Sequence, residues 1–275
     1  MKVADALQIF SKTHPGMVRA HNEDSVGVED ACGLVVLADG MGGYNAGEVA
    51  SGIAVSVATT EIAQRLRLAS AADLDPVTHE ELAVSLLRDN IGKANISIFH
   101  ASQSQPQYAG MGTTIVVGLF YDNRVAVGHV GDSRMYRLRG EKLETITRDH
   151  SLLQELIDGG MMSVEDARHS KNKNLVTRAV GIDANVMAEI HVHEVQIGDV
   201  YLLCSDGLND MVEDQDIEAV VYAMQGNLPL AADQLIQMAN DNGGRDNVSV
   251  ILVKVLADFA VPRSWQAKLL SWFKK

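Results

Sequence analysis

The order of the expected secondary-structure elements predicts an α+β fold built on antiparallel sheet. Strands come first, two helices follow, and then come many strands, further helices and one last strand. Neighbouring strands are joined as hairpins, without the strict strand–helix alternation of a doubly wound parallel sheet. The composition does not change abruptly along the 275 residues, and 47% of them are hydrophobic, so one domain with a large core is expected.

The N-terminal half predicts strands followed by two long helices. The expected strands are 7–13, 25–28 and 33–38. The third is continuously apolar, which is typical of a strand covered on both faces. A first helix is expected over 46–68. A second begins at Thr78, where Glu81 completes a capping-box pattern, and it runs to about Ala101.

The C-terminal half predicts two hairpins, then further strands and helices. The expected strands are 113–120, 124–130, 134–138, 142–145, 188–195, 199–204 and 247–255. The expected helices are 151–158, 216–224 and 229–240. Gly159-Gly160 ends the first of these helices. The following segment, 161–174, is polar and irregular apart from a short helical piece.

Net charge and cysteine content narrow the class of protein. The formal net charge of −13 argues against nucleic acid as a partner, because phosphate backbones attract basic surfaces. Cys32 and Cys204 both fall in apolar, strand-like runs, which favours buried reduced thiols over a disulfide framework. The N-terminus does not resemble a signal peptide, and no run approaches the roughly eighteen apolar residues that span a bilayer. We therefore predict a cytoplasmic location.

Five aspartate-centred segments recur where apolar, strand-like runs meet glycine or small polar residues. They are Asn22-Glu23-Asp24, Ala38-Asp39-Gly40-Met41-Gly42-Gly43, Gly131-Asp132-Ser133-Arg134, Ser205-Asp206-Gly207 and Gly244-Arg245-Asp246-Asn247. This pattern predicts carboxylates at strand ends, on turns that a rigid sheet holds in place. Carboxylates brought together repel one another, and a divalent cation removes that conflict. Oxygen ligands without Cys or His favour Mg²⁺ or Mn²⁺ over zinc.

Each of these segments also has an ordinary structural explanation. Asp39 would cap the helix that follows it, and Asp132 has Arg134 as a local ion-pair partner. Asp206 and Asp246 are typical of simple aspartate turns. Independent turns need not repeat one pattern this often, however, so the set favours a metal site. The glycine-rich run lacks the lysine and spacing of a phosphate-binding loop, which makes nucleotide binding a poor match.

Arg19 and the histidines have competing interpretations. A guanidinium binds two phosphate oxygens better than an ammonium does, which suits Arg19 to a phosphate. The alternative is a surface arginine paired with Glu23 or Asp24. For four scattered histidines we expect ordinary core or surface side chains rather than metal ligands: His21, His129, His150 and His169.

Eight motifs occur in a fixed order between about residues 8 and 255. They are Gly16-x-x-Arg19-x-x-Asn22-Glu23-Asp24, Asp39-Gly40-Met41-Gly42-Gly43, Gly112-Thr113-Thr114, Gly131-Asp132-Ser133-Arg134-x-Tyr136, Thr147-x-Asp149-His150-Ser151, Leu175-Val176-Thr177-Arg178-Ala179-Val180-Gly181, Ser205-Asp206-Gly207-Leu208 and Gly243-Gly244-Arg245-Asp246-Asn247. Each motif is modestly specific, whereas the ordered set is highly specific. In this order they resemble the metal-dependent serine/threonine protein phosphatases of the PP2C type, particularly the compact bacterial branch.

The resemblance implies a four-layer αββα sandwich, in which two stacked, mainly antiparallel sheets are flanked by helices. It also implies a binuclear Mg²⁺ or Mn²⁺ centre at one end of the sheets. Asp39 would bridge the two ions, and the Gly40 carbonyl would bind one of them. Asp206 and Asp246 would hold the other ion, and Asp132 would form a weaker third site with Asp206.

Other site roles follow from the same resemblance. Glu23 and Asp24 would act mainly through metal-bound waters, and Arg19 would hold the substrate phosphate. A histidine credited as general acid follows the Asp-Gly pair in the animal branch, whereas Met41 stands here, so a metal-bound water is expected to protonate the leaving oxygen. Residues 151–176 would form the variable flap beside the site.

The implied activity is hydrolysis of phosphoserine and phosphothreonine in proteins by a water activated between two metal ions, without a phosphoenzyme. Phosphorylated proteins would be its partners, and a serine/threonine kinase its counterpart. One alternative is a phosphopeptide-binding module that keeps the fold without the chemistry, which the retained Arg19 and Asp39 argue against. Another is an enzyme restricted to one small phosphoprotein.

The chain is expected to divide into a phosphatase domain over 1–257 and a short basic, amphipathic tail over 258–275. In the tail, four large apolar side chains fall on one helical face: Trp265, Leu269, Trp272 and Phe273. We expect this helix to pack on the domain, with contact to a membrane surface or a partner as the alternative.

Overall fold

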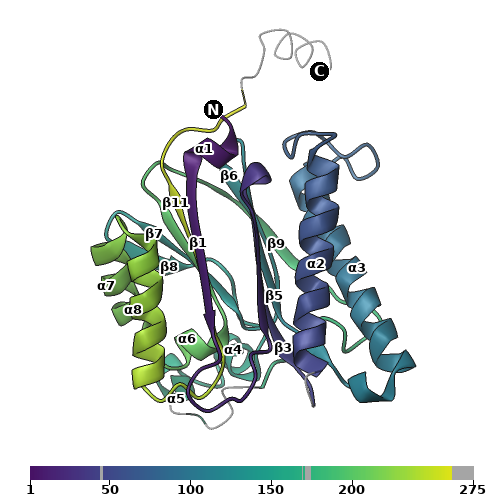
Figure 1. Ribbon diagram of the computed structural model, residues 1–275, viewed down its shortest axis with the longest axis vertical. Coiled ribbons are helices and arrows are strands. Elements are labelled where there is room, and N and C mark those ends of the chain that lie inside the picture. The colour runs from purple at the N-terminus through teal and green to yellow at the C-terminus, as the bar shows by residue number, and fades with distance from the viewer. Residues whose placement is uncertain (44–45, 169, 171–174, 262–275) are drawn as a thin grey trace.

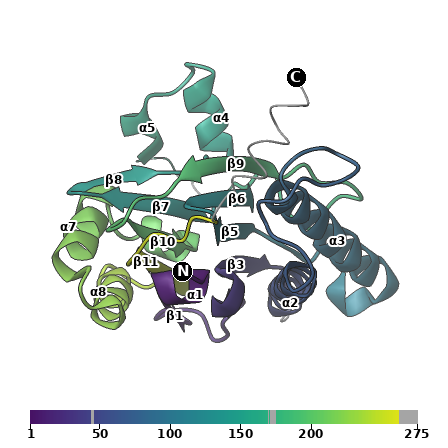
Figure 2. The same cartoon turned by 90° about the horizontal axis from the view of Figure 1, so that it is seen from above.

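The computed structural model describes residues 1–43, 46–168, 170 and 175–261. In this part of the chain, two antiparallel sheets lie face to face, and pairs of helices cover their outer sides (Figures 1 and 2). The arrangement confirms the predicted α+β class and the four-layer sandwich that the motifs imply.

The first sheet has five strands in the order β1-β11-β10-β7-β8. They are β1 (Leu7–His14), β7 (Arg134–Arg139), β8 (Lys142–Thr145), β10 (Val200–Cys204) and β11 (Val248–Val255). Every residue of β10 is buried, because β7 and β11 flank it and other layers cover both of its faces. The outer face packs against α7 (Asp214–Met224) and α8 (Leu228–Asp241).

The second sheet has six strands, five of them in the order β2-β3-β5-β6-β9, with the short β4 paired to β3. They are β2 (Asp24–Glu29), β3 (Leu34–Met41), β4 (Gly112–Thr113), β5 (Ile115–Tyr121), β6 (Arg124–Val130) and β9 (Glu189–Glu194). Two long helices, α2 (Ala46–Leu66) and α3 (Leu82–Ser104), pack on its outer face.

Three apolar clusters hold the four layers together. One lies between α2, α3 and the six-stranded sheet, and a second lies between α7, α8 and the five-stranded sheet. The third fills the space between the sheets, where Leu37 and Val116 of one sheet join Tyr201 and Ile251 of the other. Val36, next to Leu37, belongs to the first cluster, as the alternation of side chains along a strand requires.

Short elements complete the described chain. They are α1 (Val3–Ala6), α4 (Leu152–Asp158), α5 (Val164–Arg168), α6 (Asp206–Asn209) and two 3₁₀ turns, Asp30–Cys32 and Pro106–Tyr108. The Ser151 hydroxyl caps α4 by accepting a hydrogen bond from the Gln154 N–H at 3.3 Å. Helices α4 and α5 belong to the segment predicted as the flap.

Two local predictions were wrong. Helix α3 begins at Leu82 rather than Thr78, and Glu81 does not complete a capping box because its carboxylate accepts hydrogen bonds from Tyr121 and Arg124. Cys32 is partly exposed in a 3₁₀ turn rather than buried in a strand. Cys204 is buried in β10, as expected.

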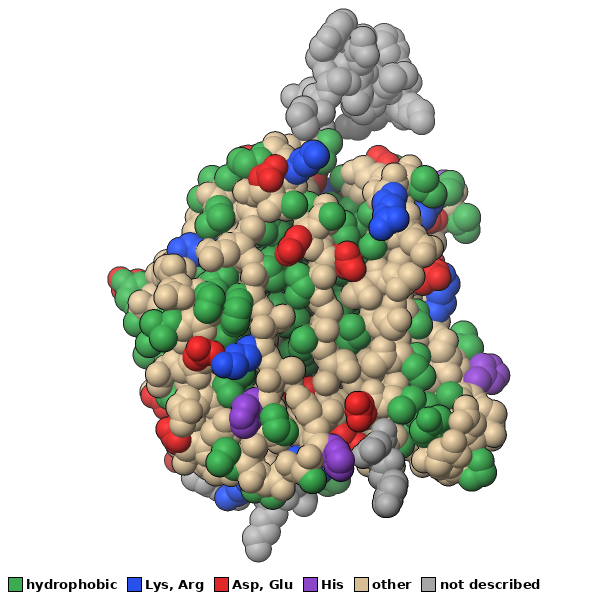
Figure 3. Space-filling model, viewed as in Figure 1, with side chains coloured by type: hydrophobic (Ala, Val, Ile, Leu, Met, Phe, Trp, Pro, Cys, Tyr) green, Lys and Arg blue, Asp and Glu red, His purple; other side chains and the backbone are tan. Residues whose placement is uncertain are grey.

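Among the helices in the described part of the chain, none has the length and apolar character that crossing a membrane requires. The apolar face predicted for the tail lies outside the described residues. On the face shown in Figure 3, acidic and basic side chains are scattered rather than gathered into one patch.

Candidate metal centre

Asp39 and Asp24 face each other across the first two strands of the six-stranded sheet. They are direct partners in the antiparallel register of β2 and β3. Asp39 lies inside β3 rather than on a turn after it, because pairing with β4 extends the strand to Met41. Its N–H donates to Thr114 Oγ1 at 3.1 Å, and its carbonyl oxygen accepts from Thr113 Oγ1 and the Thr114 N–H, each at 2.8 Å. The backbone of Asp39 is therefore fixed.

Asp24 is a buried carboxylate with only one oxygen satisfied. Its Oδ2 accepts hydrogen bonds from Ser249 Oγ at 2.6 Å and Ser205 Oγ at 2.8 Å. Its Oδ1 is buried and has no hydrogen-bond partner among the described residues. Burial raises the pKa of Asp24 to about 6, against the effect of the two serine hydroxyls. A bound ion or water would explain such a buried oxygen beside Asp39.

Two glycines allow close contacts that place the acidic segments. A Cβ on Gly207 would lie 1.9 Å from the carbonyl oxygen of Asn247, so only glycine lets α6 touch the loop before β11 at this point. This contact joins the segments that carry Asp206 and Asp246. A Cβ on Gly40 would lie 2.1 Å from the carbonyl oxygen of a residue in the first turn of α2. At this point the backbones of β3 and α2 are therefore also too close for a larger residue.

The electrostatics of the centre are dominated by like charges. Burial raises the pKa of Asp39 well above its usual range, and the negative charges of Asp24, Asp206, Asp132 and Asp246 raise it further. The pKa of Asp206 is raised in the same way, first by burial and then by Asp132 and other carboxylates. The structure therefore brings together the five aspartates predicted as site residues.

Asp132 lies in the turn between β6 and β7 and is 6% exposed. Burial and then the charge of Asp149 raise its pKa to about 6, whereas the charge of Arg134 lowers it. Arg134 binds Asp149 rather than Asp132, the partner that the ordinary structural explanation offered. Its Nε lies 2.9 Å from Asp149 Oδ1, and its Nη2 lies 2.7 Å from Oδ2. Sequence reasoning missed this role of Asp149, although its motif was visible.

Arg19 lies at the edge of the acidic group. Its Nη2 donates to Asp246 Oδ2 at 2.6 Å, rather than pairing with Glu23 or Asp24 as the alternative interpretation proposed. The Arg19 side chain is 52% exposed, so about half of its surface is open to solvent. Burial raises the pKa of Glu23, and the positive charge of Arg19 opposes that rise.

The side chain of Asn247 ties the Arg19 loop to the site. Asn247 Oδ1 accepts from the Glu23 N–H at 2.8 Å. Its Nδ2 donates to the carbonyl oxygens of Pro15 and His21 at 3.0 and 2.9 Å. These bonds hold both sides of the loop that carries Arg19, a role that the motif Asp246-Asn247 had not revealed.

A cavity of about 350 Å³ adjoins the acidic group. Asp132 and Asp206 line it, and so do Leu153 and Ile157 of α4. Part of the predicted flap therefore lines the same cavity as two of the predicted metal ligands. Its volume is within the usual range for ligand pockets.

The donor set fits Mg²⁺ or Mn²⁺. All of the candidate ligands offer oxygen, neighbouring negative charges raise the pKa values of Asp39 and Asp206, and a buried oxygen of Asp24 lacks a partner among the described residues. Hard divalent cations prefer such oxygen ligands. Gly40 directly follows Asp39 near the C-terminal end of β3, so its carbonyl oxygen belongs to the same end of the sheet as the Asp39 carboxylate.

Comparison with known proteins agrees with this geometry. The family described as protein phosphatase 2C matches residues 18–240. The chain is 37% identical over 246 residues to serine/threonine phosphatase stp of Listeria monocytogenes, an alignment that covers 88% of this chain and 94% of that protein. It is 36% identical over 256 residues to serine/threonine protein phosphatase PstP of Mycobacterium tuberculosis, covering 93% of this chain and 46% of that protein.

Solved structures show the same fold. The crystal structure of Mycobacterium tuberculosis PstP/Ppp gives a TM-score of 0.82 at 34% identity and covers 92% of this chain and 100% of that one. A catalytic domain of PstP in complex with two manganese ions gives 0.78 at 36% identity, covering 92% and 99%. Fold and site thus define a PP2C-type protein serine/threonine phosphatase. The chain belongs to the protein phosphatase 2C family, among the members found in bacteria.

Proposed function

We propose that this enzyme removes phosphate from phosphoserine and phosphothreonine in bacterial proteins and opposes a serine/threonine kinase. The observation that carries the proposal is the group of carboxylates around Asp39, whose negative charges raise the pKa values of Asp39 and Asp206. Strongly perturbed carboxylates gathered beside a cavity are typical of a functional site. Bound cations would neutralise the negative charge of this group.

The residues expected to hold the ions are those that the resemblance to the PP2C family implies. Asp39, the Gly40 carbonyl, Asp206 and Asp246 would hold two ions. Asp132 would hold a weaker third ion together with Asp206. The manganese-containing structure of PstP supports a site of this kind. When bound, Mg²⁺ or Mn²⁺ lowers the pKa of a water molecule and neutralises charge on the phosphate oxygens.

Arg19 is suited to bind the phosphoryl group. One of its nitrogens contacts Asp246, and half of its side chain remains exposed. Two parallel N–H groups of a guanidinium can donate to two phosphate oxygens. Glu23 and the unsatisfied Oδ1 of Asp24 would orient water molecules within the site.

The reaction needs no covalent intermediate on the protein. A water oxygen attacks phosphorus in line, the bond from phosphorus to the serine or threonine oxygen breaks, and that oxygen takes a proton from water. Cys204 is no nucleophile, because burial raises its pKa to about 12. Met41, beside Gly40, has no proton to donate.

Hydrolysis of a phosphothreonine peptide tests the proposal. Phosphate release is expected with Mn²⁺ or Mg²⁺ and should stop with EDTA, and in H₂¹⁸O the released phosphate should carry one ¹⁸O. Full activity in EDTA would contradict metal dependence. Binding of the peptide without hydrolysis would instead favour the phosphopeptide-binding alternative.

Activity on a panel of phosphorylated bacterial proteins would test the kinase counterpart and would show whether the enzyme acts on one small phosphoprotein.

The cytoplasmic location, the domain over 1–257 with its flap and the packing of the tail stay predictions. Co-sedimentation of the full-length and 1–260 proteins with liposomes would test membrane contact by the tail.

A further inference from the structure

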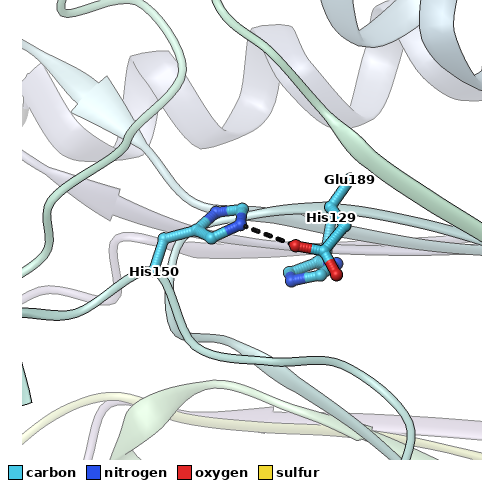
Figure 4. Close-up of side chains that lie close together, drawn as sticks. All are labelled: His129, His150 and Glu189. Atoms are coloured by element: carbon cyan, nitrogen blue, oxygen red, sulfur yellow. Dashed lines mark hydrogen bonds and ion pairs between the residues drawn. The ribbon is translucent and has the colours of Figure 1, made fainter. Parts of the chain in front are cut away.

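A second polar cluster lies against the turn that carries Asp132. It consists of His129, His150 and Glu189, which each offer a nitrogen or oxygen atom within 4.8 Å of the other two (Figure 4). His129 and Glu189 are direct partners across β6 and β9, whereas His150 precedes α4. Both histidines are buried, so their hydrogen bonds define what the cluster does.

Hydrogen bonds place the proton of His150 on Nε2. The Gly131 N–H donates to His150 Nδ1 at 3.2 Å, so that nitrogen carries no proton. Nε2 therefore donates to Glu189 Oε2 at 3.3 Å, whose other oxygen lies 2.8 Å from His191 Nε2. Arg178 Nη1 is 3.5 Å from His150 Nε2, but both atoms are donors in this tautomer, so this contact adds positive charge only.

His129 supports the ring of His150 from one side. The two rings are stacked, with centroids 4.8 Å apart and planes 13° apart. His129 Nε2 donates to the carbonyl oxygen of Arg148 at 2.8 Å, which holds the segment that leads into His150. Burial lowers the pKa of both histidines, so two neutral rings stack without charge repulsion at neutral pH.

This arrangement argues against a metal ion in the cluster. An imidazole nitrogen binds a metal through a lone pair in the plane of its ring, and nearly parallel rings direct such lone pairs along lines that do not converge. A metal on His150 Nε2 would also move the proton of the neutral ring to Nδ1, where it would meet the N–H of Gly131. The hydrogen bonds suit a supporting role instead.

His150 joins the Asp132 turn to the predicted flap. The His150 ring accepts a hydrogen bond from the Gly131 N–H, and the backbone N–H of His150 donates to the Gly131 carbonyl oxygen at 2.9 Å. Its carbonyl oxygen accepts from the N–H of Thr177, just beyond the flap, at 2.8 Å. Since Asp132 directly follows Gly131, one buried residue connects a predicted ligand with both ends of 151–176.

We propose that His150 is a positioning residue that fixes Asp132, and that Glu189 selects the tautomer which makes this possible. The inference rests on the proposed function, in which Asp132 and Asp206 hold the weakest metal site. Without an acceptor for the Gly131 N–H, the Asp132 turn would lose one of its two bonds to His150. Substitution of a group that orients a metal ligand typically lowers the metal affinity by about 10- to 100-fold.

Two substitutions of His150 separate this role from simple packing. Asn places an oxygen near the position of Nδ1, so His150→Asn keeps an acceptor for Gly131. Gln reaches the position of Nε2, so His150→Gln keeps a donor for Glu189 and loses that acceptor. Glu194→Gln, an exposed change on the same strand as Glu189, is the control.

Calorimetric titration with Mn²⁺ measures the effect apart from turnover. The weak binding step should weaken by about tenfold or more in His150→Gln and stay within about threefold of wild type in His150→Asn and in the control. The tight steps should be unchanged in all three. If His150→Gln does not fold, Glu189→Leu takes its place with the same expected loss. Equal Mn²⁺ binding by the folded Asn and Gln variants would overturn the proposal.

Long-range ¹⁵N–¹H NMR of the metal-free wild-type enzyme tests the tautomer without any substitution. A protonated Nε2 and an unprotonated Nδ1 are expected for His150. A proton on Nδ1 would overturn the inference even if the enzyme is a metal-dependent phosphatase. Conversely, activity that persists in EDTA would remove the proposed function while leaving the NMR result intact.

Discussion

The two ends of strand β5 carry polar clusters of opposite character. Just before its first residue, Thr114 binds the backbone of Asp39, whose carboxylate lies among other carboxylates that raise its pKa. At its last residue, Tyr121 donates to Glu81 at 2.6 Å, and Arg124 forms an ion pair with the same carboxylate. Negative charges are gathered at the first end, whereas at the second end a positive charge pairs with the negative one.

The difference shows how one sheet separates stability from chemistry. The balanced end needs no added ion, because hydrogen bonds and opposite charges satisfy its groups. The acidic end lowers the stability of the metal-free protein, because its carboxylates bind protons more tightly in the folded state than in the unfolded one. A bound cation would relieve this repulsion, so the acidic end is expected to bind cations, whereas the balanced end is not.

The largest effect is expected from Asp39→Asn, which keeps the size of the side chain and removes its charge. Turnover of a phosphothreonine peptide at saturating Mn²⁺ should fall by about a thousandfold or more, equivalent to at least about 4 kcal/mol. The Tm in EDTA should rise, because repulsion with Asp24 and Asp206 is removed. Undiminished turnover would contradict the assigned role of Asp39.

Arg19→Ala should lower kcat/KM by about a hundredfold, or roughly 3 kcal/mol, because the phosphate loses a charged, two-pronged donor. Arg19→Lys should recover part of that loss through its charge alone. The Tm should change little in either variant, since the Arg19 side chain is half exposed. An Arg19→Ala enzyme with wild-type kcat/KM would show that the phosphate is held elsewhere.

The metal-free protein should lose stability as pH rises from about 4 to about 6. In the fold, the pKa values of Asp24 and Asp132 rise from 3.8 to about 6. Over that window the folded state binds more protons than the unfolded state, so the free energy of unfolding falls, on the order of a few kcal/mol in total. Thermal unfolding in EDTA across this range measures it, and added Mn²⁺ at pH 7.5 should restore stability. A steady rise with pH would contradict this sign.

The smallest effect is expected at the balanced end. Arg124→Leu removes a partly buried ion pair with Glu81 and should lower stability by about 1–2 kcal/mol, with kcat and KM unchanged. Arg88→Leu is a matched control, because its pair with Glu80 is nearly half exposed and should contribute almost nothing. A loss of activity in Arg124→Leu would show that the two ends of β5 are coupled.

Sequence was most informative where chemistry coincides with a local pattern. Asp39, Asp206 and Asp246 each stand beside an apolar run, and the structure brings their charges together. It was least informative about partners that lie far apart in the chain. Arg19 binds Asp246, 227 residues away, and the pattern around Arg19 offered only nearby acids.

Local patterns also failed where tertiary contacts outweighed them. Glu81 had the spacing of a capping box, but contact with Tyr121 and Arg124 satisfies its carboxylate, and α3 begins after it. Arg134 stands two residues from Asp132, yet it binds Asp149 through two of its nitrogens. Both cases depend on a strand or loop whose position the sequence does not specify.

Gly207 has a consequence for how this enzyme tolerates random mutation. Its would-be Cβ meets the Asn247 carbonyl oxygen at 1.9 Å, so even alanine must force α6 away from that loop. A genetic screen that scores only loss of activity should recover Gly207 alleles as often as alleles of the aspartates, although glycine brings no reactive group. Suppressor mutations of those alleles should map to the neighbouring loop rather than to the acids.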